Sequence, residues 1–151
     1  MKLKVLVGNG RKIGLLTLPF LVAGVVLNIL YPSFFSVNGP PYPLKVISVI
    51  LLAAGLIVWG WSVFLILKMI PRKKLITTGP YSLNKHPLYN GVALLVIPWA
   101  GLLCNTWLGL FIGLVMYIGS RLFSPEEEKM LSKIFGKEWD EYSANVKLPW
   151  L

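Results

Sequence analysis

The stretch HPLYNGVALLVIPWAGLLCNTWLGLFIGLVMYIGS, residues 86–120, decides the fold because it contains no Lys, Arg, Asp or Glu. As one helix, rising about 1.5 Å per residue, it would far exceed a hydrocarbon core about 30 Å thick. It must therefore fold back on itself, and the polar break at residues 104–106 is the natural turn. This predicts a tight hairpin of two short helices, 88–103 and 107–123, with a kink in the first at Pro98.

Two further apolar segments precede this hairpin, at residues 13–31 and 44–70. The 151-residue chain is 56% hydrophobic and 14% charged, whereas a soluble domain of this size has about a quarter of its residues charged. We therefore expect an all-α polytopic membrane protein in which four transmembrane helices form a single domain over residues 1–151.

The charge is segregated along the chain. The formal net charge is +9, and residues 1–125 hold eleven Lys or Arg and no acidic residue. Because the basic residues flank the apolar segments and form no stripe interleaved with aromatics, they favour membrane lipids, and not nucleic acid, as partners. The tail 1–12 and the connection 68–85 are basic, but residues 32–43 carry no charge. The positive-inside rule then predicts an integral membrane protein with both termini in the cytoplasm.

Amphipathic helices are predicted after the last span, between about residues 125 and 146. Ser124 has the position of an N-cap, Pro125 that of the first helical residue, and Glu127 completes a capping box. Gly136 is a plausible end of this helix. Its apolar face is formed by Met130, Leu131, Ile134 and Phe135, and a second short helix carries Trp139, Tyr142 and Val146. Such helices lie on the cytoplasmic surface or cover a site there.

The reactive side chains cluster at the two cytoplasmic ends of the predicted hairpin, in residues 79–91 and 121–128. Because the two ends of a hairpin are neighbours, His86 and Glu128 can approach each other despite their separation along the chain. We therefore expect a polar pocket at the cytoplasmic surface of the membrane.

These two segments carry a specific series of motifs. In chain order they are Gly79-Pro80-Tyr81, Lys85-His86-Pro87-Leu88-Tyr89-x-Gly91, Glu127-Glu128-x-x-Leu131-x-x-x-Phe135-Gly136, and then Tyr142 and Pro149. In order and spacing, residues 77–149 resemble the integral membrane methyltransferases of the isoprenylcysteine carboxyl methyltransferase and phospholipid N-methyltransferase superfamily. Membrane sterol reductases that use NADPH share the His-Pro-x-Tyr core, but they usually continue with Gly-Glu, where this chain has Gly91-Val92. The chain departs from the superfamily at Lys85, where Arg is usual, and at Trp139, where Tyr is common.

The resemblance implies a methyltransferase that uses S-adenosylmethionine and acts on a lipidic or membrane-partitioned acceptor, such as an isoprenylcysteine carboxylate or a phospholipid amine. It implies a pocket formed by the last two spans and the C-terminal helix, with the cofactor-binding residues Gly79, Tyr81, His86, Pro87, Tyr89, Gly91, Glu127 and Glu128. In this interpretation the two carboxylates hold the amine of the cofactor and His86 its carboxylate, while aromatic rings face its sulfonium. Arg121 is a candidate for holding an anionic substrate group. No catalytic residue and no metal ligand is assigned.

Each of these residues also has a purely structural interpretation. Among the polar residues, Glu127 could complete a capping box, Glu128 could interact favourably with the helix dipole, His86 could cap a helix and Arg121 could anchor the span to lipid headgroups. The other interpretations are an aromatic belt for Tyr81 and Tyr89, and a turn and a helix-packing site for Gly79 and Gly91. Two other functions stay open, an NADPH-dependent membrane sterol or enone reductase and a non-catalytic membrane accessory protein.

Overall fold

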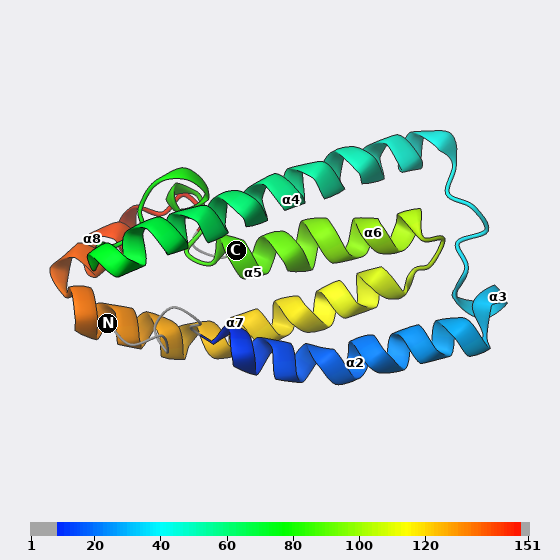
Figure 1. The fold of residues 1–151 in the computed structure, drawn as a ribbon, viewed down its shortest axis with the longest axis horizontal. Coiled ribbons are helices and arrows are strands. Elements are labelled where there is room, and N and C mark those ends of the chain that lie inside the picture. Colours follow the sequence, from blue (N-terminus) through cyan, green and yellow to red (C-terminus); the bar gives the residue numbers. More distant parts are fainter. Residues whose placement is uncertain (1–8, 149–151) are drawn as a thin grey trace.

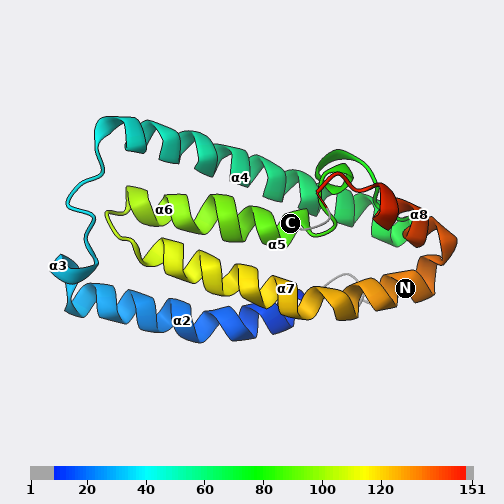
Figure 2. The same cartoon turned by 180° about the vertical axis from the view of Figure 1, so that it is seen from behind.

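The computed structural model describes residues 9–148, and its regular elements are all helical, which confirms the predicted all-α class. The elements are α2 (Gly10–Leu30), α3 (Pro32–Phe35), α4 (Tyr42–Met69), η1 (Ile70–Arg72), η2 (Gly79–Ser82), α5 (Pro87–Gly91), η3 (Val92–Val96), α6 (Ile97–Leu103), α7 (Leu108–Phe135) and α8 (Lys137–Asn145). Four rods lie side by side in the order α4, α5–α6, α7 and α2, each antiparallel to its neighbour (Figures 1 and 2). The connection between α3 and α4 therefore runs from one edge of this layer to the other.

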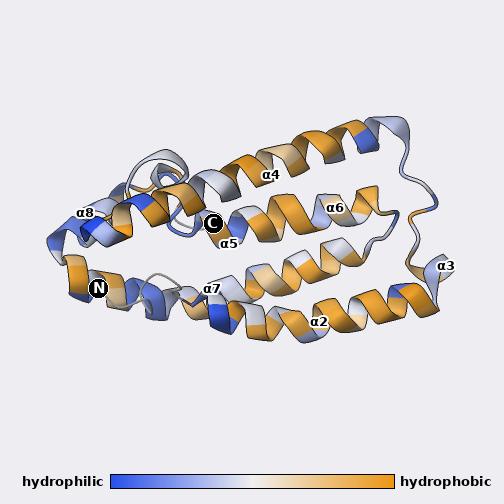
Figure 3. Ribbon diagram, in the orientation of Figure 1, coloured by the Kyte–Doolittle hydropathy of each residue, from blue (hydrophilic) through white to orange (hydrophobic). Residues whose placement is uncertain are grey.

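Within the described residues, three helices are long and apolar enough, by length and composition, to cross a membrane: Gly10–Leu30, Tyr42–Arg72 and Leu108–Phe135. Their large apolar side chains face outward; Ile29 is 71% exposed and Ile57 is 65% exposed. Apolar residues cover the length of the rods, whereas hydrophilic residues gather near α8 and the start of α5 (Figure 3). Apolar exposure on this scale matches a lipid surround, so the chain is an integral membrane protein.

The predicted span 88–103 corresponds to a continuous helical run, Pro87–Leu103, that is shorter than the other three. Its middle part, η3, is a π-helical turn that ends two residues before Pro98. Pro98 has no N–H, and a widened turn accommodates a residue that cannot continue the regular hydrogen-bond ladder. The helix in which a kink is predicted at Pro98 thus has a π-helical turn just before that residue.

The turn between α6 and α7 lies at the polar residues expected to break the helix. Asn105 adopts a left-handed conformation with φ of 59°, and the N–H of Thr106 donates to the carbonyl of Gly101 at 2.9 Å. The two helices that meet here approach closely: a Cβ at Gly109 would lie 2.6 Å from the carbonyl oxygen of Ile97. Small residues permit this approach, as they do between helices in membranes.

The predicted helix start at Ser124 is wrong, because α7 continues through Pro125 to Phe135. The Ser124 hydroxyl does not cap a new helix but donates to the Ser120 carbonyl at 2.6 Å within the same helix. Pro125 removes one amide donor from the ladder, yet the helix stays intact because α2 packs along it. The capping box of Glu127 is therefore absent, and its carboxylate has other partners.

The end of α7 falls where the sequence predicts it. Gly136 follows the last helical residue with φ of 54°, a conformation that glycine adopts without steric cost. The chain then reverses into α8, which lies across the same end of the bundle as the start of α5 (Figure 1). Near the C-terminus, the N–H of Leu148 donates to the Leu83 carbonyl at 2.8 Å. Pro149, the last residue of the motif series, lies outside the described residues.

Candidate functional site

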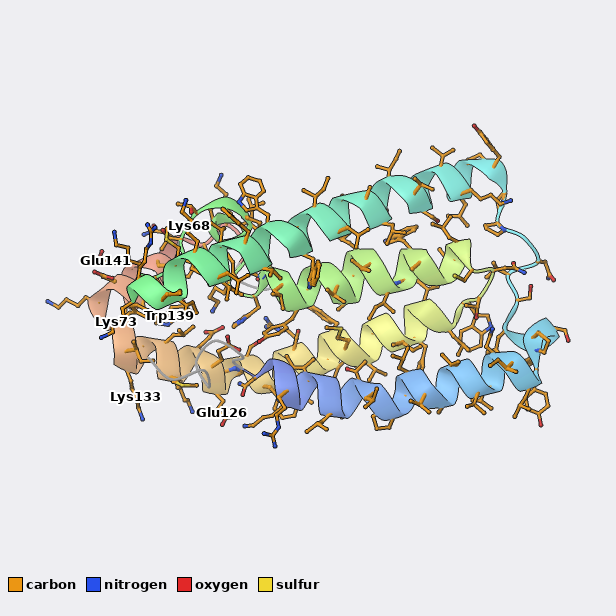
Figure 4. The ribbon with its side chains drawn as sticks, in the orientation of Figure 1. Lys68, Lys73, Glu126, Lys133, Trp139 and Glu141 are labelled. Atoms are coloured by element: carbon orange, nitrogen blue, oxygen red, sulfur yellow. The ribbon has the colours of Figure 1, made fainter. Side chains whose placement is uncertain are left out.

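A cavity of about 290 Å³ lies at the end of the bundle where α4 ends and α5 begins. Its apolar walls come from α4, α5 and α7, and α8 lies over it. The lining residues are Gly10, Ile66, Ile70, Lys74, Leu75, Ile76, Tyr81, Lys85, His86, Leu88, Tyr89, Glu127, Leu131, Phe135, Trp139 and Tyr142. The labelled lysines and glutamates all lie at this end of the molecule, as does Trp139 (Figure 4). The cavity is therefore a mostly apolar chamber at the charged end of the bundle.

The local sequence before α5 fixes the position of His86. The side-chain oxygen of Asn84 accepts the backbone N–H of His86 at 2.8 Å, an Asx turn that leads into the helix. Pro87 occupies the first position of α5, where its missing N–H costs no helical hydrogen bond. His86 is thus held at the helix start with its side chain only 5% exposed.

The predicted approach of His86 and Glu128 is present in the structure. Nε2 of His86 lies 3.1 Å from Oε1 of Glu128, and Nζ of Lys85 lies 2.7 Å from Oε2 of the same carboxylate. The carboxylate is 27% exposed and Lys85 13%, so water screens these pairs only in part. Glu128 itself is absent from the cavity lining, whereas Lys85 and His86, the two residues that it pairs with, both line the cavity.

Glu127 lines the cavity beside Tyr89. The backbone N–H of Asn9 donates to its Oε2 at 3.2 Å. The Tyr89 ring stacks on the His86 ring with centroids 6.2 Å apart and an interplanar angle of 21°. A carboxylate has about four acceptor positions, so the donor from Asn9 leaves capacity for a ligand.

Aromatic side chains from α8 also line the cavity. Trp139 is buried and packs edge-on against Tyr142, with ring centroids 5.5 Å apart. The Tyr142 hydroxyl donates to the Tyr81 carbonyl at 2.8 Å, which ties α8 to η2. Burial, and then the negative charge of Glu127, raises the pKa of the Tyr81 hydroxyl; burial, and then Glu128, raises the pKa of Tyr142. Both hydroxyls therefore stay neutral donors at physiological pH.

Of the sequence-predicted site residues, Tyr81, His86, Tyr89 and Glu127 line the cavity, and Gly79, Pro87, Gly91, Arg121 and Glu128 do not. Gly79 has φ of 63° and packs against Trp61. Gly91 is buried against Val58 of α4. These contacts match the turn and the helix-packing site that were the structural interpretations of the two glycines. Arg121 is exposed on α7.

Sequence reasoning missed several lining residues. Trp139 and Tyr142 were expected on an amphipathic helix, and their spacing of three does place them on one face of α8, but this pattern does not reveal a cavity. Lys85 appeared only as a departure from the superfamily motif. Gly10 and its neighbour Asn9 carried no signal, because their role depends on tertiary contacts, of Asn9 with Glu127 of α7 and of Gly10 with Tyr89 of α5. Within residues 9–148, no cluster of His, Cys, Asp and Glu is arranged to hold a metal ion.

Comparison with known proteins defines the family. Residues 43–138 match the phospholipid methyltransferase family, which is more than half of the chain, and the chain belongs to that family. It is 38% identical over 76 residues to proteins from both subspecies of Oryza sativa named probable protein-S-isoprenylcysteine O-methyltransferase. It is 32% identical over 76 residues to the Arabidopsis thaliana protein-S-isoprenylcysteine O-methyltransferase B.

These matches are partial. They cover 48% of this chain, 38% of the rice proteins and 37% of the Arabidopsis protein. The chain therefore matches less than two fifths of the length of these curated relatives. No solved structure matches the chain.

Proposed function

We propose that the chain is an S-adenosylmethionine-dependent methyltransferase that acts at the membrane surface on a lipidic or membrane-partitioned acceptor. The observation that carries this proposal is the cavity at the end of the bundle, which is lined by one carboxylate, Glu127, together with several aromatic rings. Small-molecule sites are mostly apolar chambers with a few placed polar groups, with volumes from about 300 Å³ upward. Family membership supports the same activity.

The cavity residues fit the functional groups of S-adenosylmethionine. Its amine is an ammonium, and Glu127 is a carboxylate with unused acceptor positions. Its carboxylate requires donors; Lys85 and His86 line the cavity wall, and the Lys85 ammonium keeps N–H groups beyond the one that it gives to Glu128. Its sulfonium is a cation that aromatic faces stabilise, and Tyr81, Tyr89, Trp139 and Tyr142 line the chamber. The bound cofactor supplies an electrophilic methyl group.

The remaining predicted residues have indirect roles in this proposal. Glu128 positions Lys85 and His86 through the two ion pairs, so we assign it no direct contact with the cofactor. Gly79, Pro87 and Gly91 shape the segment that carries the lining side chains. Arg121, on the exposed surface of α7, is proposed to hold an anionic group of the acceptor at the membrane surface.

Among acceptors, an isoprenylcysteine-like carboxylate is favoured over a phospholipid amine. A carboxylate is already ionised near pH 7, whereas an ammonium must lose a proton before its nitrogen can attack. His86 is the one histidine of the chain, and its Nε2 is engaged by Glu128. The names of the rice and Arabidopsis relatives point to the same acceptor class. Methyl transfer from labelled cofactor to a prenylated cysteine with a free carboxylate, and not to phosphatidylethanolamine, is the expected result.

We propose in addition that Pro87–Leu103 is a fourth membrane span, paired with α7 in a hairpin, and that both termini and the cavity face the cytoplasm. The basic connection between α4 and α5 and the uncharged connection between α3 and α4 support this orientation. In a Cys104→Ser background, single cysteines at Asn38 and Lys74 should react with impermeant reagents from opposite sides. Labelling from the same side would overturn the topology.

A comparison of the binding of S-adenosylmethionine with the binding of NADPH tests the proposed function. Isothermal titration of the detergent-purified chain should show saturable binding of S-adenosylmethionine and of its demethylated product, and none of NADPH. Binding of NADPH alone would favour a reductase. Binding of neither ligand would favour a non-catalytic membrane protein.

A further inference from the structure

The first turn of α2 lies against the cavity, although it is outside residues 43–138, the part that matches the family. Asn9, which immediately precedes α2, is 5% exposed. Its backbone N–H donates to Glu127, and its side-chain amide donates to the carbonyl of Phe123. Both partners belong to α7, so Asn9 attaches the start of α2 to the turn of α7 that carries the Glu127 carboxylate.

Gly10 lines the cavity beside Asn9 and contacts Tyr89. A Cβ at Gly10 would lie 3.3 Å from both Cε1 and the hydroxyl oxygen of Tyr89. A side chain larger than hydrogen therefore presses on the Tyr89 ring, which lines the cavity together with Glu127. One helical turn later, a Cβ at Gly14 would meet no atom within 4 Å.

We infer that the first turn of α2 is part of the cofactor site, where Asn9 is a positioning residue for the Glu127 carboxylate and Gly10 keeps the space that Tyr89 needs. This inference rests on the proposed function, because it takes the cavity as the cofactor site. The backbone N–H of Asn9 donates to Glu127, and the side-chain amide of Asn9 is anchored on the Phe123 carbonyl, so together they fix the direction of the carboxylate. A carboxylate fixed in this way meets a ligand ammonium without reorganisation.

A glycine pair on α2 provides the matched test. Gly10→Leu and Gly14→Leu both replace a helical glycine by a good helix former, so both gain helix propensity. Titration of the purified full chain with S-adenosylmethionine should give a dissociation constant raised about tenfold or more for Gly10→Leu and unchanged for Gly14→Leu. Equal affinity of both variants and the wild type would overturn the inference.

A second measurement separates positioning from folding, in case Gly10→Leu does not fold. Asn9→Ala removes the side-chain bond to the Phe123 carbonyl that holds the backbone N–H of this residue toward Glu127, and it should raise the dissociation constant about fivefold. Lys12→Ala removes the exposed ion pair with Glu126 between the same two helices, and it should leave the dissociation constant unchanged. In a Glu127→Gln background, Asn9→Ala should have no further effect, because the group that it positions is already changed. Additive effects in this double-mutant cycle would mean that Asn9 acts only on folding.

The wild-type titration distinguishes the two proposals. If the wild type does not bind S-adenosylmethionine, the proposed function fails and this inference fails with it. If the wild type binds and neither Gly10→Leu nor Asn9→Ala weakens binding, only the role of α2 is overturned.

Discussion

The two ends of the helix layer use polar contacts differently. At the turn end, residues 31–42 and 103–108, uncharged groups bond to one another: the side-chain oxygen of Asn105 accepts the N–H of Gly39 at 2.7 Å, and its amide donates to Ser36 at 2.9 Å. At the cavity end, residues 9–12, 66–91 and 121–148, the contacts include ion pairs, and the Glu127 carboxylate faces a cavity.

The difference shows which contacts close the fold and which prepare a site. The turn end satisfies its polar groups internally, so changes there should affect stability and not ligand affinity. The cavity end keeps acceptor capacity on Glu127 and aromatic faces toward an apolar chamber. Changes there should affect affinity, with a size that depends on how directly each residue meets the ligand.

Glu127→Gln should have the largest effect on binding. Loss of a charge-assisted hydrogen bond to the cofactor ammonium costs about 1.5–3 kcal/mol, which is on the order of a tenfold to hundredfold rise in the dissociation constant. Isothermal titration measures it. Glu126→Gln is the matched control, because Glu126 is the preceding residue of α7 and is exposed. An equal loss of affinity in both variants would show that the effect comes from the change in net charge and not from a contact in the cavity.

Glu128→Gln should weaken binding less, by about fivefold, because Glu128 acts through Lys85 and His86. It should also lower the thermal unfolding midpoint without ligand, since a partly buried ion-pair network is lost. The exposed Glu138 of α8 is the control, and Glu138→Gln should change neither quantity. A loss of affinity larger than that of Glu127→Gln would make Glu128 the direct ligand.

Tyr142→Phe should weaken binding about threefold. The variant keeps the ring in the cavity but loses the hydrogen bond to the Tyr81 carbonyl that ties α8 to η2, a bond worth about 1 kcal/mol. Asn145→Ala is the control on the same helix, because its side-chain bond stays within α8. The expected result is faster dissociation of the cofactor from Tyr142→Phe in a rapid-mixing experiment. An unchanged dissociation rate would mean that α8 is held by other contacts.

Asn105→Ala should have the smallest effect on binding, with an unchanged dissociation constant, yet destabilise the fold by about 2–3 kcal/mol. It removes two side-chain bonds and places alanine at a φ of 59°. Thermal unfolding in detergent measures the loss. Asn105→Gly isolates the part due to the bonds, because glycine tolerates this conformation. A change in cofactor affinity in either variant would contradict the separation of the two ends.

Much of the fold could be predicted from hydropathy, because lipid contact imposes long uncharged helices. The predicted segments 13–31 and 44–70 differ from α2 and α4 by at most three residues at any end. The error at Ser124-Pro125 has a clear origin: this sequence suits a helix start and is also tolerated inside a helix that a neighbour supports. Packing of α2 against α7 decides between the two, and local sequence does not record it.

The site was predictable where the turn between α6 and α7 returns the chain to the same end of the bundle, as it does for His86 and Glu128. The different contacts of the two adjacent acidic residues were not predictable. Glu127 and Glu128 are neighbours in sequence, but a helix turns about 100° per residue, so one meets the cavity and the other meets Lys85 and His86. Asn9 and Gly10 were missed because only tertiary contacts identify them.

Hydrogen exchange with and without S-adenosylmethionine tests most directly the claim that the cavity end is the cofactor site. At saturating cofactor, amides from Glu126 to Phe135 and those of α8 should gain protection, because these segments form the walls of the cavity. Amides at the turn end, from Tyr31 to Tyr42, should not change. Protection that is equal at both ends, or no change between Glu126 and Phe135 under saturating conditions, would contradict the placement of the cofactor in this cavity.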